Sequence, residues 1–253
     1  MQTVIESGTV ITQITEGVAT VSFFHPKGNS LPGVLLARLA EEIAALGHNP
    51  EAAVIVLRSE GTGPFCGGAS FQELQAIRSP EQGKQFFLGF ARLILAMTRC
   101  PRFIIARVHG KAVGGGVGVC AAADYAFAVP SASVKLSELA VGIGPFVVGP
   151  VIERKIGLSA FSSLAVNAME WRVAEWAREH GLFAEVRDTV EEMDQAIAEL
   201  ASRLAGSNPE AMARMKQIFW AGTEHWERLL EERAAMSGKL VLSDFARRAI
   251  SAR

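Results

Sequence analysis

Two short loops of small residues could provide backbone N–H groups for catalysis. Each loop comes after an apolar segment typical of a buried strand. Residues 67–69 come after the apolar run 53–57, and the three glycines 114–116 come after the run 103–108. Glycine lets another group approach the backbone closely, and the first N–H groups of a helix have no partner within that helix. Two such loops can direct two N–H groups at one carbonyl oxygen, as in an oxyanion hole. For a single loop, tight helix–strand packing is an equally good interpretation.

Glu138 is the carboxylate best suited to proton transfer, because it lies among apolar residues in the segment 134–143. A carboxyl group in such surroundings tends to have a raised pKa, which suits acid–base work near neutral pH. A solvated glutamate in a turn is the plainer interpretation. The residues around Glu138 do not by themselves exclude it.

Other catalytic chemistries lack their motifs in this sequence. The segment 157–161 lacks the second glycine of a nucleophile elbow, and the glycine run 114–116 matches neither a dinucleotide fingerprint nor a P-loop. The five histidines show no metal-ligand spacing. We therefore predict no metal site and no covalent nucleophile.

Composition restricts the partners and the compartment. The chain has 253 residues, 49% hydrophobic and 20% charged, as in ordinary globular proteins. A net charge of -1 gives no basic field for nucleic acid or a membrane, and no apolar run is long enough to span a bilayer. Three cysteines, an odd number, indicate a reducing compartment, and no signal peptide is visible. We expect a cytoplasmic protein with no membrane or nucleic-acid partner.

The elements that must position these residues alternate between strand and helix, which predicts an α/β fold. We expect an α/β core over 1–190 and a C-terminal helical region over 191–253. Glu16-Gly17 predicts the tight turn of a hairpin. The remaining expectations are hairpin strands at 10–14 and 18–23, strands at 53–57, 103–108 and 125–129, and helices around 35–46, 86–97, 115–123, 159–167, 171–180, 189–205, 209–221 and 224–240.

Four motifs in order carry a resemblance to a known family: FCGGAS, HGKAVGGGVGV, AAADYAFA and KLSELAVGIGP. With this order and spacing the chain resembles the crotonase superfamily of enoyl-CoA hydratases and isomerases. The resemblance implies a spiral of ββα units, a C-terminal helical trimerisation region and acyl-CoA thioester substrates. It also implies a homotrimer or a hexamer built as a dimer of trimers. Coenzyme A would be part of the substrate, with no separate cofactor.

The resemblance also implies roles for particular residues. The N–H groups of Ala69 and Gly115, beside Gly68 and Gly114, would hold the thioester oxygen of an enolate. Glu138 would transfer the proton.

One departure from the family pattern favours one reaction over another. The family's hydratases use two glutamates, and here their first position is Gly118 while the second is Glu138. One carboxylate suffices to move a proton from C2 to C4, so the resemblance favours double-bond isomerisation. The alternatives are hydration with a single glutamate, thioester hydrolysis, and a catalytically weak acyl-CoA-binding protein.

Two further residues are expected at the substrate. Phe146 stands where dienoyl-CoA isomerases have an aspartate, which argues against that reaction and implies an apolar contact with the acyl group. Lys27 follows Pro26 in a turn, where the resemblance implies a contact with the coenzyme A phosphates.

Overall fold

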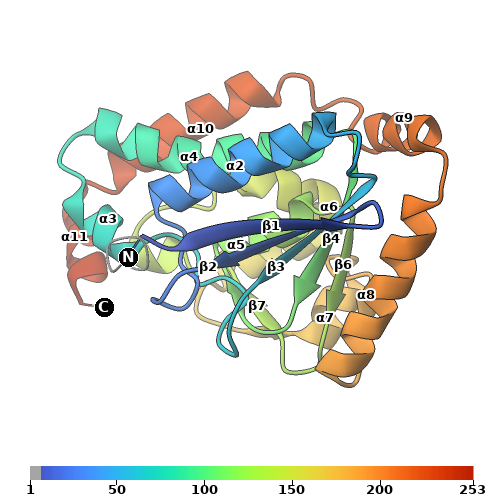
Figure 1. The fold of residues 1–253 in the computed structure, drawn as a ribbon. Helices are drawn as coiled ribbons and strands as arrows, with labels where there is room; N and C mark the ends of the chain where they lie inside the picture. The colour runs from blue at the N-terminus through green and yellow to red at the C-terminus, as the bar shows by residue number, and fades with distance from the viewer. Residues whose placement is uncertain (1–6, 253) are drawn as a thin grey trace.

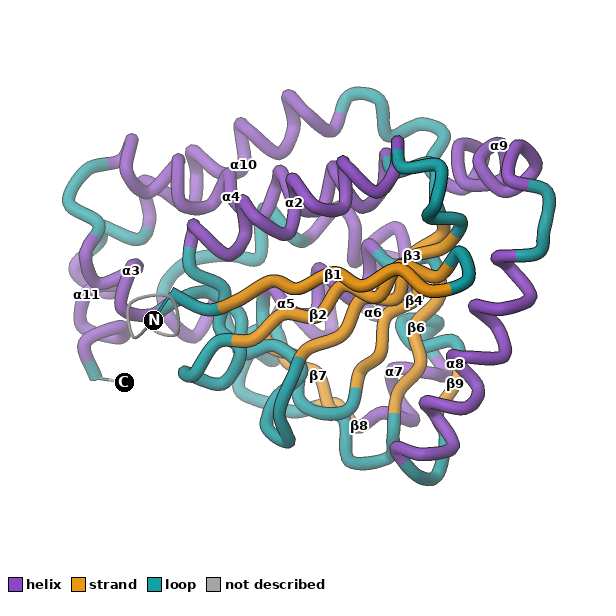
Figure 2. Tube along the Cα trace, viewed as in Figure 1, coloured by secondary structure: helices purple, strands orange, loops and turns teal. Residues whose placement is uncertain are grey.

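The centre of the molecule is a six-stranded sheet, which a computed structural model describes together with the rest of residues 7–252 (Figures 1 and 2). Residues 1–6 and residue 253 lie outside the described residues. The prediction that the N-terminus carries no signal peptide falls partly on these residues. The strand order is β1-β2-β3-β4-β6-β9, antiparallel at the first pair and parallel thereafter. The strands are β1 (Thr9–Thr15), β2 (Val18–Phe24), β3 (Val54–Ser59), β4 (Phe103–Val108), β6 (Tyr125–Ala128) and β9 (Glu185–Val186).

The hairpin that opens the chain follows from its turn residues. Glu16 and Gly17 have φ angles of 50° and 82°, and Thr15 pairs with Val18. Two consecutive positive φ angles in a two-residue loop match the twist of the flanking strands. The predicted hairpin is therefore confirmed.

The molecule has a second, smaller sheet of three strands. It consists of β5 (Ala112–Val113), β7 (Ser133–Lys135) and β8 (Arg172–Val173). The helix predicted over 171–180 is wrong at its start, because residues 172 and 173 pair antiparallel with β7 and the helix begins only at Ala174. Long-range strand pairing overrides the local helical pattern there.

Helices cover both faces of the six-stranded sheet, so β3 and β4 are apolar on both sides. In Figure 1, α2, α4 and α10 lie together above the sheet, while α8 packs against β3 and β4. The helices are α2 (Gly33–His48), α3 (Phe71–Ala76), α4 (Pro80–Arg99), α5 (Gly115–Ala122), the 3₁₀ turn η1 (Leu139–Val141), α6 (Gly149–Val166), α7 (Ala174–Glu179), α8 (Val190–Ala205), α9 (Pro209–Phe219), α10 (Trp226–Leu240) and α11 (Asp244–Ser251).

Two glycines bring the C-terminal helix α10 into backbone contact with α4. A Cβ atom added to Gly83 of α4 would lie 2.6 Å from the Cα of Gly238 in α10. A Cβ atom added to Gly238 would lie 2.4 Å from the backbone nitrogen of Lys84. No side chain fits between the two helices at this point. The chain's C-terminal part is thereby held against the core.

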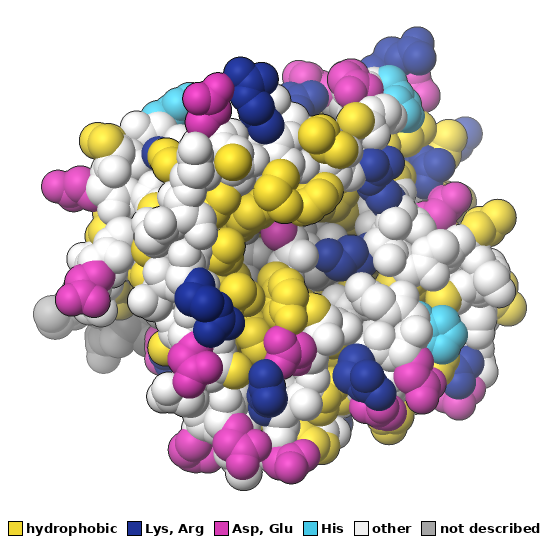
Figure 3. Space-filling view, turned by 90° about the vertical axis from the view of Figure 1, so that its right-hand side faces the viewer, with side chains coloured by type: hydrophobic (Ala, Val, Ile, Leu, Met, Phe, Trp, Pro, Cys, Tyr) yellow, Lys and Arg dark blue, Asp and Glu magenta, His cyan; other side chains and the backbone are white. Residues whose placement is uncertain are grey.

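The surface carries charges of both signs. On the face in Figure 3, Lys and Arg side chains alternate with Asp and Glu, and hydrophobic side chains gather around a central hollow. No helix within residues 7–252 has both the length and the apolar character needed to cross a membrane.

Candidate active site

The first small-residue loop is shaped by Gly68. Its φ angle is +83°, and a Cβ atom added there would lie 2.7 Å from the carbonyl oxygen of Val113, which excludes any residue with a side chain. The carbonyl oxygen of Gly68 accepts a hydrogen bond from the N–H of Leu31, which anchors the loop. Ser70 then caps α3 by accepting from the N–H of Glu73. Ala69 is held between these two fixed points.

The second loop leads directly into α5. Gly114 has a φ angle of +52° and donates its N–H to the carbonyl oxygen of Lys135 in β7. A Cβ atom on Gly115 would lie 2.0 Å from Cε1 of Phe90, and one on Gly116 would lie 2.7 Å from Cβ of Cys66. The glycines thus allow the start of α5 to lie directly against its neighbours.

The two loops meet, as the sequence predicts. The N–H of Val113 donates to the carbonyl oxygen of Cys66 at 2.9 Å, and a Cβ atom added to Gly68 would lie 3.8 Å from the backbone nitrogen of Gly115. Within residues 7–252, neither the N–H of Ala69 nor that of Gly115 has a hydrogen-bond acceptor. Both N–H groups are therefore free to donate to a ligand.

Glu138 lies beside these donors and is buried. A Cβ atom added to Gly114 would be 2.8 Å from its Oε1, so the carboxylate rests directly on the glycine backbone. Its Oε2 is buried and has no hydrogen-bond partner within the described part of the chain. Burial raises the pKa of Glu138 to about 7, against a smaller lowering by its own backbone N–H. The carboxyl group can therefore accept and return a proton near neutral pH.

Position 118 is closed to a second carboxylate. A Cβ atom added to Gly118 would lie 2.8 Å from Cγ1 of Val148 and 3.7 Å from Cδ1 of Ile94. The sequence predicts that the second carboxylate is missing here, and the structure adds a packing reason, because two apolar side chains lie against the position. Glu73, a conceivable second acid, accepts instead from the N–H of Gly33 at the start of α2.

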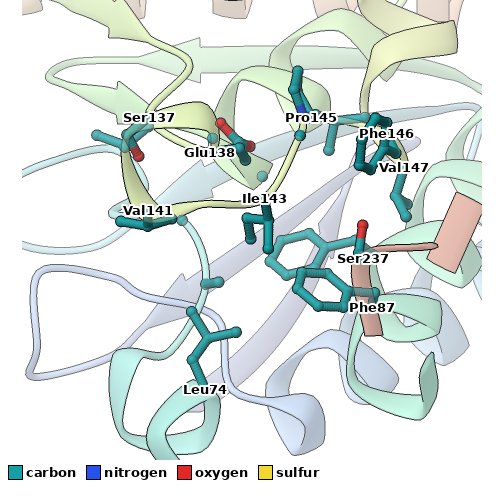
Figure 4. Close-up of a pocket in the computed structure, with 18 of the residues that line it drawn as sticks. Leu74, Phe87, Ser137, Glu138, Val141, Ile143, Pro145, Phe146, Val147 and Ser237 are labelled. Carbon is teal, nitrogen blue, oxygen red and sulfur yellow. The ribbon is translucent and has the colours of Figure 1, made fainter. Parts of the chain in front are cut away.

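An apolar cavity of about 60 Å³ joins the two loops to Glu138. Figure 4 shows Glu138 and Phe146 bordering it from one side and Leu74 and Phe87 from the other. Gly68, Ala69, Gly114, Gly115, Glu138 and Phe146, all expected at the site, line this one cavity. Its apolar side chains are Ala69, Phe71, Leu74, Phe87, Phe90, Val113, Val141, Ile143, Pro145, Phe146, Val147 and Val148.

Lys27 is exposed, outside the cavity. Its Nζ donates to Oε1 of Gln72 at 2.8 Å, which places it beside α3, the helix whose Phe71 and Leu74 line the cavity. This position is compatible with a contact to the outer part of a long ligand.

The C-terminal helix α10 contributes a residue that sequence reasoning missed. Ser237 lines the cavity although it lies far from every motif in the chain. The only local signal is the Ser237-Gly238 pair inside a helix, since an interior glycine is unfavourable without a packing reason.

The far end of α5 is held by a hydrogen bond and an ion pair. Nζ of Lys155 donates to the carbonyl oxygen of Ala123 at 2.8 Å, and Asp124 pairs with the buried Lys216 at 2.7 Å. The carboxylate of Asp124 also accepts from the N–H of Ile104. Asp124 therefore has a structural role, away from the cavity.

Comparison with known proteins identifies the family of this chain. The model of the enoyl-CoA hydratase/isomerase family matches residues 13–248. The chain belongs to this family. Curated relatives include the peroxisomal Delta(3,5)-Delta(2,4)-dienoyl-CoA isomerase of Arabidopsis thaliana, 27% identical over 88% of this chain and 84% of the relative. The mitochondrial methylglutaconyl-CoA hydratase of Mus musculus is 31% identical over 78% of this chain and 63% of the relative.

Solved structures agree on the fold. An enoyl-CoA hydratase from Bacillus halodurans superimposes with a TM-score of 0.89 at 20% identity, covering 96% of this chain and 99% of that one. The crotonase-type α/β architecture expected from the sequence is confirmed, including the C-terminal helices. No group of three or more His, Cys, Asp or Glu within residues 7–252 could hold a metal ion.

Proposed function

We propose that this member of the enoyl-CoA hydratase/isomerase family moves the double bond of an enoyl-CoA thioester from C3 to C2. The observation that carries the proposal is a single buried carboxylate beside two unpaired backbone N–H groups in one apolar cavity. Coenzyme A enters as part of the substrate, and no further cofactor takes part. The compartment we propose is the cytoplasm, with which the free, buried cysteines agree.

The reaction needs one base that later acts as an acid. The Glu138 carboxylate removes a proton from C2, and the electron pair of that C–H bond moves into the thioester to form a dienolate. The N–H groups of Ala69 and Gly115 hold the negative oxygen, where donors already in place stabilise charge as it develops. The protonated Glu138 then delivers its proton to C4, the thioester carbonyl reforms, and the double bond lies between C2 and C3.

Hydration is the second candidate, favoured by the similarity to methylglutaconyl-CoA hydratase from mouse. Adding water requires a group that activates the water while C2 is protonated. The packing of Val148 over Gly118 removes the place of a second carboxylate, so Glu138 would have to perform both steps. A dienoyl isomerisation is less compatible, because Phe146 offers no carboxylate. In a catalytically weak acyl-CoA-binding protein, the unpartnered Oε2 of Glu138 would have no role.

The deciding experiment is product analysis with matched 2-enoyl-CoA and 3-enoyl-CoA thioesters of equal chain length. We expect the 3-enoyl thioester to be converted to the 2-enoyl thioester, with slow hydration of the latter. Efficient formation of a 3-hydroxyacyl product by the unmodified protein would establish the hydratase instead. No turnover of either, with retained binding, would favour the binding protein.

We also propose a homotrimer, or a hexamer built as a dimer of trimers. Support comes from apolar side chains left uncovered on α9, where Ile218 is 70% exposed and Phe219 is 49% exposed. Trp226 and Leu230 of α10 are buried within this chain and add nothing to this uncovered surface. Sedimentation of a stable monomer at micromolar concentration would contradict the proposal.

A further inference from the structure

The cavity wall contains one hydroxyl that the proposed reaction does not use. Three polar side chains face the cavity: Ser137, Glu138 and Ser237. Ser137 adjoins Glu138 in the same loop, whereas Ser237 comes from α10 in the C-terminal region. Figure 4 shows Ser237 beside Phe87, with its oxygen directed toward the space below Phe146 and Val147. Ser237 and Glu138 therefore border different parts of the cavity.

The hydroxyl of Ser237 makes no hydrogen bond to the described part of the chain. The residue is 1% exposed, but its Oγ is not fully enclosed, because it opens on the cavity. A hydroxyl inside a helix usually bonds to the carbonyl oxygen one turn earlier. Thr98, which is also buried in α4, does so by donating to the carbonyl oxygen of Ile94 at 3.0 Å. Ser237 makes no such bond, so its hydroxyl is free to bond with a group that enters the cavity.

The position of this hydroxyl is enforced by the helix that carries it. The neighbouring Gly238 is in backbone contact with α4, where a Cβ atom added to it would lie 2.7 Å from the carbonyl oxygen of Pro80. α10 can therefore neither rotate nor withdraw at this point without losing the contact. A fixed donor and acceptor facing an apolar cavity is the arrangement by which binding sites orient a ligand.

The ligand group that suits Ser237 is a neutral oxygen. No Lys, Arg or His side chain lines the cavity within the described residues, and the nearest ionisable group is Glu138. A carboxylate on the acyl group would lose its hydration there without a counter-charge. A hydroxyl or a carbonyl group needs only the single hydrogen bond that Ser237 can donate or accept.

We infer that Ser237 is a specificity-determining residue that binds a hydroxyl or oxo substituent on the acyl group, beyond the carbons that react. This inference rests on the proposed function in one respect, namely that an acyl-CoA thioester occupies the cavity. It assigns an oxygenated acyl-CoA, rather than a plain hydrocarbon chain, as the preferred substrate class.

The test separates binding from turnover by using saturated acyl-CoA thioesters, which cannot isomerise. We compare, by calorimetry, a hydrocarbon acyl-CoA with a series of equal length that carries a hydroxyl or oxo group at each successive carbon beyond C4. We expect one substituted member to bind about tenfold more tightly than the hydrocarbon, the size of a typical neutral hydrogen bond. Ser237→Ala should abolish this preference and leave the affinity for the hydrocarbon unchanged.

Ser59 provides a matched control. It is also 1% exposed with an unpartnered Oγ, but it does not line the cavity. Ser59→Ala should keep the preference that Ser237→Ala loses. Ser237→Cys, which keeps the shape of the side chain with a somewhat larger atom but bonds weakly, should behave like Ser237→Ala if the hydrogen bond matters. Melting temperatures of all variants exclude loss of the fold.

Two results would overturn the inference. One is equal affinity of the unmodified protein for every member of the series, and the other is a preference that survives Ser237→Ala. Equal loss of affinity for hydrocarbon and substituted thioesters would assign Ser237 to packing and also count against it. If the proposed isomerisation is wrong, turnover of 3-enoyl thioesters fails while the binding preference remains, so the two failures are distinguishable.

Discussion

The loop around Glu138 and the middle of α5 around Gly118 have opposite surroundings. Glu138 is a buried carboxylate with one oxygen left without a partner, while Gly118 is covered by the side chains of Val148 and Ile94. The first region keeps a reactive group at a cost in stability, and the second is packed as an ordinary core. The difference teaches that this cavity is built for one carboxylate. The position of a second carboxylate, at Gly118, is occupied by apolar side chains.

Replacing the retained carboxylate should have the largest effect on activity. Glu138→Gln keeps the shape but cannot accept the C2 proton, so kcat/KM for a 3-enoyl-CoA should fall roughly 10²–10⁴-fold. Steady-state kinetics measure this, and calorimetric binding of a saturated acyl-CoA serves as the control for an intact cavity. Full activity of the variant would remove Glu138 from the mechanism.

Introducing a carboxylate at position 118 with no other change should destabilise the folded state. Gly118→Glu would drive its side chain into Val148 and bury an unpaired carboxyl group, lowering the free energy of unfolding by roughly 3 kcal/mol or more. Denaturant unfolding measures the loss.

The double variant Gly118→Glu, Val148→Ala tests whether packing against Val148 causes this loss of stability. It should recover part of the stability non-additively, because the two side chains compete for one space. Only in that background do we expect hydration activity to rise. Equal losses with and without Val148→Ala would show that packing against Val148 is not the reason.

The pKa of Glu138 should make stability depend on pH. Its folded-state value of about 7 exceeds the ordinary glutamate value, so between the two the folded state binds the proton that the unfolded state has released. Stability therefore falls as pH rises through this window and levels off above about pH 7, by about 3 kcal/mol at about 1.4 kcal/mol per pKa unit. Urea unfolding on either side of the window measures the change.

The same variant isolates the contribution of this one group. In Glu138→Gln the part of the pH dependence due to position 138 should disappear, leaving the variant more stable than the unmodified protein above pH 7. In the enzyme, kcat/KM should rise with pH as Glu138 loses its proton, with an apparent pKa near the same value. An identical pH profile of stability in both proteins would contradict the buried, unpaired state of Glu138.

The smallest expected effect concerns the helix contact behind the cavity. Gly83→Ala places a methyl group against the Gly238 backbone and should cost about 1–3 kcal/mol of stability, with a moderate rise in KM as α10 moves away. Gly63→Ala is the control, because a Cβ atom there meets nothing within 4 Å. Thermal unfolding of the two variants measures the difference. Equal stability would mean that α10 adjusts without strain.

Much of the fold could be predicted from the sequence because its signals are local. The Glu16-Gly17 turn selects a hairpin, and the apolar runs of β3 and β4 select buried strands. The short β7 and the helices α3 and α11 carry too few residues to show a period, so they escaped prediction. The residues of β8 have a helical pattern and become a strand only because β7, far away in the chain, pairs with them.

The sequence by itself determined the parts of the candidate site that depend on backbone geometry. Gly68, Gly114 and Gly115 are glycines because positive φ angles or direct contacts leave no room for a side chain, and such requirements are visible as residue types. The motif spacing added Glu138. The tertiary structure alone decided that Val148 covers Gly118, that burial brings the pKa of Glu138 to about 7, and that Ser237 faces the cavity. These three depend on packing between segments distant in the chain, which no local pattern encodes.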